Sequence, residues 1–430
     1  MNTGRKVLLT MCAVVLCAAA QQKPFSGTPD LEHSLRALNE LGSVLVIAAH
    51  PDDERSDVLA YFARGRHMRA AYLSLTRGEG GQNLIGPEQG AQLGVIRTQE
   101  LLDARKIDGA EQFFTRAIDF GFSKSAAETM EKWDRGRVLG DVVWVIRRYR
   151  PDVLITVFTG TPFDGHGQHQ VSALFAKEAF RAAGDPQRFP EQLKWVTPWQ
   201  AKRIVHAGFP PEFRMGETDK TLQAAGSIPT GELNPVVGYS YQELAVLSRS
   251  MHHSQGTGAM RRLGPSHVDF ALVDGEPAAK DVFDGIDTTW NRIAGGTSVG
   301  PMLEEAIRTF SPSHPERTIP LLVKARVAIA KLDDPLARIK LRETDDAIAA
   351  CGGIFAEAQA RTPDVSPGEM LQVTTTVLNR SDVEVKLTGA RMEGIFEEDM
   401  AAKPAALGLN QSATVEFSRE VPKTQAYSQP

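Results

Sequence analysis

The segment from residue 44 to residue 54, VLVIAAHPDDE, constrains the fold of this chain more than any other. Its first six residues are apolar without interruption, which is typical of a strand that is covered on both faces. One histidine and three carboxylates follow at once, namely His50, Asp52, Asp53 and Glu54. In an open α/β sheet, ligands bind beyond the carboxyl ends of the strands. The segment therefore predicts a polar site at the end of a buried strand.

Strand-like runs alternate with segments of helical length over the first half of the chain. Strands are expected at 43–49, 69–76, 111–116 and 152–158, and helices at 31–41, 56–64, 89–105, 126–149 and from 169 to 183. This alternation predicts βαβ units and a mostly parallel α/β sheet with helices on both faces. Right-handed crossovers then place the polar loops after the first and fourth strands on the same sheet edge.

A catalytic-type domain is expected over residues 24–260. Its later part, 185–240, is rich in proline and glycine and is expected to be irregular. The helix expected at 241–252 ends in His252 and His253, which either border a pocket or cap the helix.

Two further regions follow this domain. Residues 261–360 are expected to form an irregular and helical extension, with helices over 300–350. From 365 to 430 the pattern changes to β-like alternation, strongest at 371–379 and 383–387, which predicts a small and possibly incomplete β-rich module.

The first twenty residues resemble a secretory signal peptide. A basic pair at 5–6, an apolar stretch at 7–20 and small residues before Gln21 are the expected features. The chain is then expected in the periplasm or outside the cell, without stable membrane insertion. Cys351 is the single cysteine left after cleavage, so a buried thiol is expected and not a disulfide scaffold. A net charge of −5 offers no attraction for nucleic acid.

Two loops after buried strands carry the residues of a candidate metal site. His50 and Asp53 offer two ligands at one strand end, and His169 from the second loop offers a third. Catalytic zinc sites commonly use three protein ligands and leave a position for water. Asp52 is then the candidate general base. His166 is the group that would stabilise an oxyanion or protonate a leaving amine.

Each motif alone also has an ordinary structural explanation. The acidic stretch 52–54 before a helix is a good helix start, because negative charge is favoured near a helix N-terminus. The stretch 166–169 could equally be a polar loop. Both motifs together, each after a buried strand, favour the metal site.

Three charged residues are candidates for substrate binding. Arg77 and Glu79 lie in the glycine-rich stretch 77–83, where Arg77 could hold sugar hydroxyls or a phosphate. A flexible turn is the alternative for this stretch. Arg97, one helical turn before Glu100, belongs either to a surface ion pair or to a pair that supports the site.

With AHPDDE at 49–54 and HxxH at 166–169, the chain resembles the PIG-L/LmbE family of zinc-dependent de-N-acetylases. That family includes deacetylases of glycosylphosphatidylinositol, mycothiol and bacillithiol synthesis. The resemblance covers about residues 40–255 and implies a Rossmann-like sheet.

The resemblance also implies residue roles. It makes His50, Asp53 and His169 the zinc ligands, Asp52 the base that activates water, and His166 the partner of the tetrahedral oxyanion. The reaction it implies is hydrolysis of the N-acetyl group from a glucosamine-type sugar.

This chain departs from the family pattern at three places. Gly167 and Gln168 stand between the two histidines where many relatives carry Pro and Asp, which removes an acidic group from the pocket wall. The signal peptide favours an acetamido sugar outside the cytosol over the thiol-pathway substrates. The module at 365–430 is additional, and it either binds carbohydrate or packs on the catalytic domain.

The expected function is a secreted Zn²⁺-dependent hydrolase that releases acetate from an N-acetylglucosamine-type sugar or glycan. Fe²⁺ or Co²⁺ would suit the same ligands. A metal-dependent amidase or esterase for a non-sugar substrate, and a non-catalytic carbohydrate-binding protein, are the rival hypotheses. The sequence sets neither the sugar nor the oligomeric state.

Overall fold

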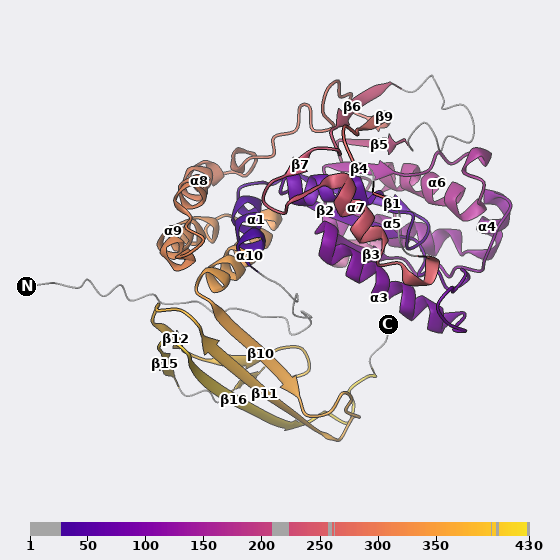
Figure 1. Cartoon of the computed structure of the whole chain (residues 1–430). Helices are drawn as coiled ribbons and strands as arrows, with labels where there is room; N and C mark the ends of the chain where they lie inside the picture. The colour runs from indigo at the N-terminus through magenta and orange to yellow at the C-terminus, as the bar shows by residue number, and fades with distance from the viewer. Residues whose placement is uncertain are drawn as a thin grey trace, which may run out of the picture. The chain divides into compact units, whose positions relative to one another are not determined.

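The computed structural model divides the chain into two compact units. One unit spans residues 40–292, and the other combines the residues before 40 with those from 293 onward (Figure 1). The described residues are 27–208, 223–256, 260–261, 263–396, 398–400 and 404–427. The signal peptide predicted at 1–20 lies outside them. Within these ranges, no helix combines the length and the apolar character needed to cross a membrane.

A seven-stranded sheet forms the centre of the unit of residues 40–292 (Figure 1). Its order is β3-β2-β1-β4-β5-β9-β6. The first five strands in this order are parallel, and β9 is antiparallel to both β5 and β6. The predicted mostly parallel α/β fold is confirmed. The strands are β1 (Ser43–Ala48), β2 (Arg69–Ser74), β3 (Glu111–Phe114), β4 (Val153–Thr156), β5 (Arg203–Ala207), β6 (Ala224–Ile228) and β9 (Val268–Gly275).

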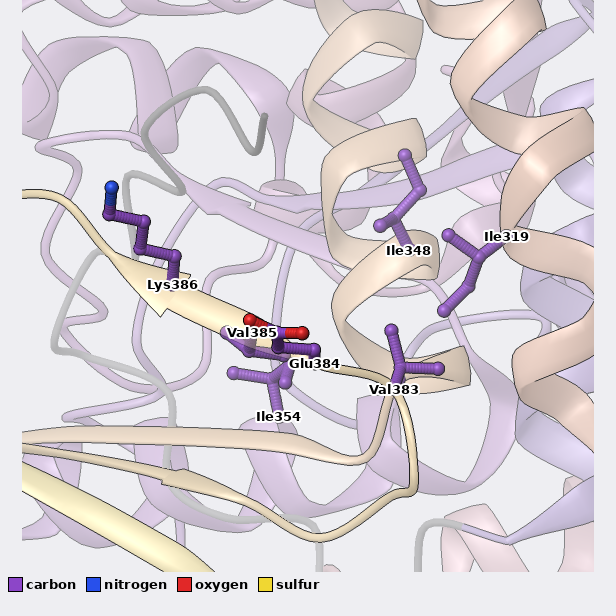
Figure 2. A pocket seen from close by; sticks show the side chains of 8 residues that line it. Ile319, Ile348, Ile354, Val383, Glu384, Val385 and Lys386 are labelled. Atoms are coloured by element: carbon purple, nitrogen blue, oxygen red, sulfur yellow. The ribbon is translucent and has the colours of Figure 1, made fainter. Parts of the chain in front are cut away.

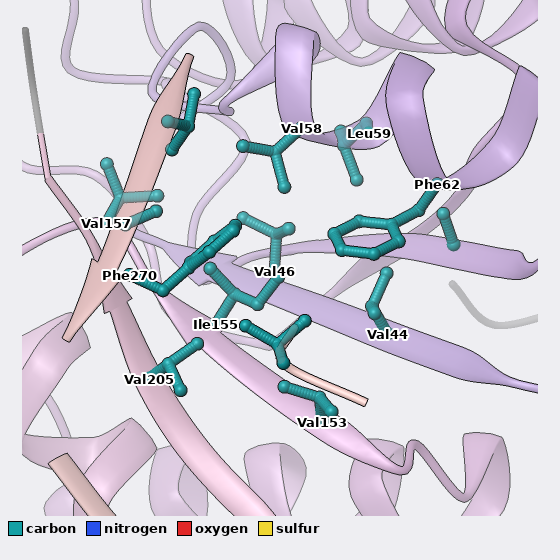
Figure 3. Packing of buried hydrophobic residues seen from close by; sticks show 14 of the residues in the cluster. Val44, Val46, Val58, Leu59, Phe62, Val153, Ile155, Val157, Val205 and Phe270 are labelled. Atoms are coloured by element: carbon teal, nitrogen blue, oxygen red, sulfur yellow. The ribbon is translucent and has the colours of Figure 1, made fainter. Parts of the chain in front are cut away.

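Helices cover both faces of this sheet. Alternate residues of β1 enter two separate hydrophobic clusters, with Val44 and Val46 in one and Leu45 and Ile47 in the other. Figure 3 shows the first cluster, where helix side chains such as Phe62 pack over β1 and β4. This packing explains the unbroken apolar run of the first strand. The helices are α2 (Ser56–Ala60), α3 (Ala91–Asp108), α4 (Ala126–Lys132), α5 (Arg135–Tyr149), α6 (Gly167–Ala182) and α7 (Tyr241–Arg249).

Five strands lie in segments for which the sequence predicted irregular structure. β5, β6 and the two-residue strands β7 (Leu233–Asn234) and β8 (Tyr239–Ser240) fall within 185–240, and β9 falls within 261–360, so the prediction was wrong for these residues. β6 reads AAGSI and lies at the sheet edge, where low β propensity is tolerated. Because β9 belongs to the central sheet, the compact unit continues past the expected boundary at 260 to Arg292.

The single helix expected at 126–149 is two helices. Trp133 leaves the helical conformation, with a φ of −90° and a ψ of 136°, and its indole N–H donates to the carbonyl of Ile118. Asp134 then caps α5 by accepting a hydrogen bond from the backbone N–H of Arg137. A side-chain cap of this kind starts a new helix. The helix expected at 56–64 likewise ends early, and a π-helical turn, Tyr61–Gly65, continues it.

The second unit contains four helices and a β-rich module among its described residues. A three-stranded antiparallel sheet of order β10-β11-β16 carries the strand predicted at 371–379. Buried Cys351 ends α10, and burial raises the pKa of its thiol to about 12. The elements are α1 (Thr28–Leu38), α8 (Val299–Thr309), α9 (Ile319–Ile329), α10 (Pro335–Cys351), β10 (Ile354–Ala360), β11 (Met370–Asn379), β12 (Val385–Leu387), β13 (Ala390–Met392), β14 (Glu398–Met400), β15 (Ala405–Leu407) and β16 (Gln411–Glu420).

A small hollow lies in this second unit (Figure 2). Ile319 of α9, Ile348 of α10 and the segment 383–386 line it. Its lining is mainly aliphatic, and Glu384 and Lys386 are its charged members. Glu384 is the one carboxylate among the residues that line this hollow, so they do not form a metal site of three ligands.

Candidate metal centre

The polar site lies where the strand order of the sheet reverses. β1 is flanked by β2 on one side and by β4 on the other, and it pairs with β4 from Val44–Val153 to Ile47–Thr156. The chain leaves both strands at the same sheet edge, through the loops 49–55 and 157–166. Diverging loops at such a switch point open the crevice in which α/β proteins bind ligands.

Two carboxylates of the loop after β1 accept hydrogen bonds from its own backbone and so define its conformation. The side chain of Asp53 accepts a hydrogen bond from the backbone N–H of His50 (2.8 Å), and Glu54 accepts one from the backbone N–H of Asp52 (2.8 Å). Asp52 has a φ of 96°, a left-handed backbone conformation that is unfavourable for residues other than glycine. The hydrogen bonds hold the chain in this strained turn.

Two side chains from the loop after β1 and one from the first turn of α6 converge on one point. Asp53 Oδ2 is 3.0 Å from His50 Nδ1, and Asp53 Oδ1 is 3.4 Å from His169 Nε2. One potential ligand atom of each residue lies within 4.8 Å of the others. The ring of Phe158 stacks on His169, with 4.0 Å between the centroids, and fixes its plane. The structure therefore brings together the three residues that the sequence proposed as metal ligands.

Opposite charges stabilise each other in this cluster. Burial alone would lower the pKa of His50, but the carboxylate of Asp53 outweighs burial and raises that pKa to about 9. Burial would likewise raise the pKa of Asp53, but His169 and His50 lower it well below its usual range. This carboxylate is thus held ionised between two imidazoles. Two imidazoles and a carboxylate are a donor set that suits a divalent transition metal.

Asp52, the predicted base, is held by two arginines. Arg97 donates to its Oδ1 (3.0 Å), and Arg249 at the end of α7 lies 3.1 Å from its Oδ2. Burial and the negative charge of Asp53 raise the pKa of Asp52, and the two arginines oppose this shift. A carboxylate that is oriented in this way and has a raised pKa suits proton transfer.

Arg97 supports this loop from inside the protein. Its side chain is only 3% exposed, and its guanidinium also donates to the carbonyls of Pro51 and Gly78. A Cβ at Gly78 would lie 2.3 Å from its Nη1, and one at Gly81 would lie 2.5 Å from it. The glycine-rich stretch therefore lets the backbone pack against this buried cation. The substrate contact proposed for Arg97 stays a prediction, and its observed contacts are with the Asp52 loop.

Arg77 and Glu79 are engaged in contacts beside the site. Arg77 donates to the hydroxyl of Thr98 (3.1 Å), and its guanidinium lies 4.1 Å from the ring centre of Phe114. Glu79 accepts from the backbone N–H groups of Arg77 (3.2 Å) and Asp119 (3.1 Å). These contacts tie the glycine-rich stretch to its neighbours, and a substrate contact for either residue stays a prediction.

His166 caps α6 and has a defined tautomer. Its Nδ1 accepts a hydrogen bond from the backbone N–H of Gln168 (3.2 Å), so in the neutral ring Nε2 carries the proton. Its ring centre lies 5.1 Å from that of His50 and 4.9 Å from that of His169. Burial and these two imidazoles lower the pKa of His166 to about 4. At neutral pH this side chain is therefore an uncharged hydrogen-bond donor.

Close backbone packing explains Gly167, one departure from the family pattern. Its N–H donates to the carbonyl of Ser123 (2.8 Å), a bond that proline could not make. An added Cβ would lie 2.2 Å from the carbonyl oxygen of Ser125. Glycine thus fits the start of α6 against the segment before α4.

Glu54 joins the site to a buried ionic network. His252 Nε2 lies 2.7 Å from its Oε1, and Arg105 lies 3.3 Å from the same oxygen. Burial would raise the pKa of Glu54, but His252 and Arg105 lower it well below the usual range. His252 is fully buried. It therefore supports the AHPDDE loop from behind and neither lines an open pocket nor caps the helix at the surface.

Replacing His252 by leucine is expected to destabilise the unit by about 3 kcal/mol, since a buried carboxylate that loses a partner costs about 3–5 kcal/mol and Arg105 stays as a second partner. Urea unfolding at pH 7 measures this, and all five tryptophans lie within residues 40–292. His267→Leu is the control, because that side chain is 68% exposed. Because the pKa of Glu54 is depressed in the folded state, the effect should shrink below about pH 4.

The sequence did not indicate several partners of the site. Arg249 lies 197 residues after Asp52, so no local spacing links the two residues. Nothing in the sequence pointed to Asp119. Gln168 stood out only as a departure from the family pattern, with no role assigned to it.

Comparison with known proteins supports the family resemblance of the two motifs. Residues 45–180 match the family model described as GlcNAc-PI de-N-acetylase, PIG-L. A 1D-myo-inositol 2-acetamido-2-deoxy-alpha-D-glucopyranoside deacetylase of Kineococcus radiotolerans is 27% identical over 260 residues, which are 51% of this chain and 70% of that protein. The diacetylchitobiose deacetylase of Thermococcus kodakarensis is 29% identical over 150 residues, 34% of this chain and 52% of that protein.

Among solved structures, the N,N'-diacetylchitobiose deacetylase of Pyrococcus horikoshii is similar, with a TM-score of 0.37 and 18% identity, over 50% of this chain and 70% of that one. The family match covers both motif-bearing loops, after β1 and after β4. Residues 45–180 therefore match the PIG-L family of de-N-acetylases, and the relatives named as deacetylases agree with this match.

Proposed function

We propose that this protein is a zinc-dependent deacetylase that hydrolyses the N-acetyl group of an N-acetylglucosamine-type sugar or conjugate. The convergence of His50, Asp53 and His169, with Asp52 beside them, is the observation that carries the proposal. The relatives named as deacetylases of acetamido sugars support the choice of substrate class.

The donor set fits zinc, which catalytic sites commonly hold with three protein ligands. When bound, zinc would polarise the acetyl carbonyl and make water a nucleophile near neutral pH. His50, Asp53 and His169 would hold it. Iron or cobalt would be accepted by the same donors, so metal analysis must accompany any assay.

Asp52 is placed to move the proton. Each of its oxygens accepts one arginine contact and keeps a lone pair for another hydrogen bond. In the proposed reaction, Asp52 takes a proton from the water as the new C–O bond forms. It returns this proton to the amine nitrogen as the C–N bond breaks, so that acetate and the free amine leave.

His166 would stabilise the negative charge that develops on the acetyl oxygen. Its Nε2–H is the free donor of a neutral ring, because Nδ1 is occupied at the start of α6. A preorganised donor of this kind typically contributes a factor of about 10²–10³ to kcat.

Replacing His166 by alanine is therefore expected to lower kcat by about 10²–10³-fold with a smaller change in KM. Steady-state acetate release measures both constants. His314→Ala, an exposed histidine of the other unit, is the matched control and should keep the wild-type rate. Unchanged kcat in the His166 variant would remove this residue from the mechanism.

The proposal is tested by acetate release and metal content on the same preparation. N-acetylglucosamine, diacetylchitobiose and a simple N-acetyl amino acid are the substrates. Release from the sugars with about one bound zinc is the expected result. Release only from the amino acid would favour an amidase. Metal binding without release from any substrate would favour the non-catalytic alternative.

We also propose export, which rests on the sequence of residues 1–20. Expression of the full chain in a bacterium with a periplasm should give a periplasmic product whose mass corresponds to a chain that starts at Gln21. A cytosolic product that retains residue 1 would contradict export and leave the deacetylase proposal untouched.

A further inference from the structure

Gln168 occupies a buried position between the two histidines of the HxxH motif. Its side chain has no solvent exposure. Its amide nitrogen donates to Asp119 Oδ1 (3.1 Å) and to the carbonyl of Gly121 (2.9 Å). Its amide oxygen lies 2.9 Å from Nε2 of His50. A neutral amide thus links a carboxylate to one of the candidate metal ligands.

These partners leave one orientation for the amide. The carbonyl of Gly121 can only accept, and Asp119 Oδ1 already accepts from the backbone N–H of Gly121 (2.9 Å). Both therefore require the NH₂ group of Gln168, and its oxygen must face His50. That oxygen is an acceptor, so Nε2 of His50 must carry the proton.

The tautomer of His50 then follows. Without a metal, Nδ1 donates its own proton to Asp53 Oδ2, 3.0 Å away. Because the oxygen of Gln168 keeps the other proton on Nε2, Nδ1 is the nitrogen that would give up its proton and offer a lone pair to a metal. It faces the carboxylate that also contacts His169. The hydrogen bond from Nε2 of His50 to Gln168 thus leaves Nδ1 as the nitrogen that can bind a metal.

We propose that Gln168 is a positioning residue for the metal centre: oriented by Asp119, it holds His50 in the tautomer whose Nδ1 serves as the metal ligand. The inference rests on the proposed metal-dependent function. Metal-binding histidines usually donate their second N–H to a carboxylate or a carbonyl. Here the carboxylate of Asp119 acts one residue further away, through an amide.

The same contacts explain why a carboxylate would not serve at this position. In Gln168→Glu, the oxygen that replaces the amide nitrogen would be an acceptor, and it would face two other acceptors, Asp119 Oδ1 and the carbonyl of Gly121. Lone pairs at hydrogen-bonding distance repel. Gln168 and Asp119 therefore form a matched pair in this chain, and the neutral side chain is required because the acid stands at 119.

Zinc affinity and the protonation of His50 test this inference. Gln168→Met keeps the length of the side chain and removes both functions of the amide. Gln170→Met is the matched control: Gln170 lies on the same helix, is buried, and accepts only from the backbone N–H of Ala126 among the hydrogen bonds described for it. The zinc dissociation constant is measured by competition with a chelator. Selective ¹⁵N-histidine labelling of the zinc-loaded protein reports which ring nitrogen carries a proton.

The expected result is a zinc affinity that falls by about 10–100-fold in Gln168→Met and also falls in Gln168→Glu, with little change in Gln170→Met. In the zinc-loaded wild type, Nε2 of His50 should carry the proton. A deprotonated Nε2 in the zinc-loaded wild type would overturn the inference. This measurement needs no variant, so it decides the question even if Gln168→Met fails to fold.

Equal zinc affinity in Gln168→Met and Gln170→Met would also overturn it, and continued acetate release by the wild type would leave the proposed function standing. A wild type that binds no zinc would overturn this inference together with zinc dependence.

Discussion

Replacing Asp53 by alanine is expected to remove the metal and to lower acetate release by more than about 10³-fold. Asp53 contacts both histidines, through Oδ2 to His50 and Oδ1 to His169, so it is the ligand that joins the loop after β1 to the start of α6. A metal Lewis acid supplies several kcal/mol of transition-state stabilisation, and about 4 kcal/mol corresponds to a factor of 10³. Elemental analysis after gel filtration and a saturating-substrate assay measure the two losses.

Two further variants make this experiment decisive. Asp103→Ala is the control, because Asp103 lies on α3, pairs with Lys106 and has a side chain that is 41% exposed. It should keep both metal and activity. His169→Ala removes a ligand from α6 and should reproduce the loss even if Asp53→Ala disturbs the turn after β1. Full metal content in both ligand variants would show that the metal binds elsewhere.

Replacing Asp52 by asparagine is expected to leave the metal in place and to lower kcat by about 10²–10⁴-fold, the usual contribution of a general base. Asparagine keeps the shape of the side chain and can still accept one hydrogen bond from Arg97 or Arg249. It cannot accept a proton from water. Metal content and kcat measured on the same sample separate this effect from the loss of a ligand.

Asp274→Asn is the matched control for this change. Asp274 pairs with Arg181 and its side chain is 38% exposed, so the same chemical change should leave kcat unaltered. A rate in Asp52→Asn within about threefold of wild type would assign the base to another group. Loss of metal in Asp52→Asn would instead mean that this carboxylate helps to hold the centre.

Local sequence was sufficient for the residues whose partners are close along the chain. His50 and Asp53 are three residues apart at the end of a buried strand, and a turn there brings them together. His169 could be added because the carboxyl ends of neighbouring parallel strands share one edge. Both steps use only strand periodicity and the topology rules of α/β sheets.

Strands β6 and β9 show where this reasoning failed. Both belong to the antiparallel end of the sheet, where half-buried strands need no continuous apolar run. β6 contains glycine and serine, so neither propensity nor periodicity identified it. Pairing with β9 stabilises β6, and pairing is a property of the folded chain.

By itself, the sequence determined the class of fold, the resemblance to a de-N-acetylase family, and the five polar residues that meet at the ends of β1 and β4. Tertiary structure alone decided how these residues are held. Arg249 reaches Asp52 across 197 positions, His252 is buried against Glu54, and Gln168 joins Asp119 to His50. The physical reason is that a buried charge needs hydrogen-bond partners, and these partners are the residues that the folded chain packs beside it. Packing brings together residues that are far apart in the sequence, so local spacing does not identify them.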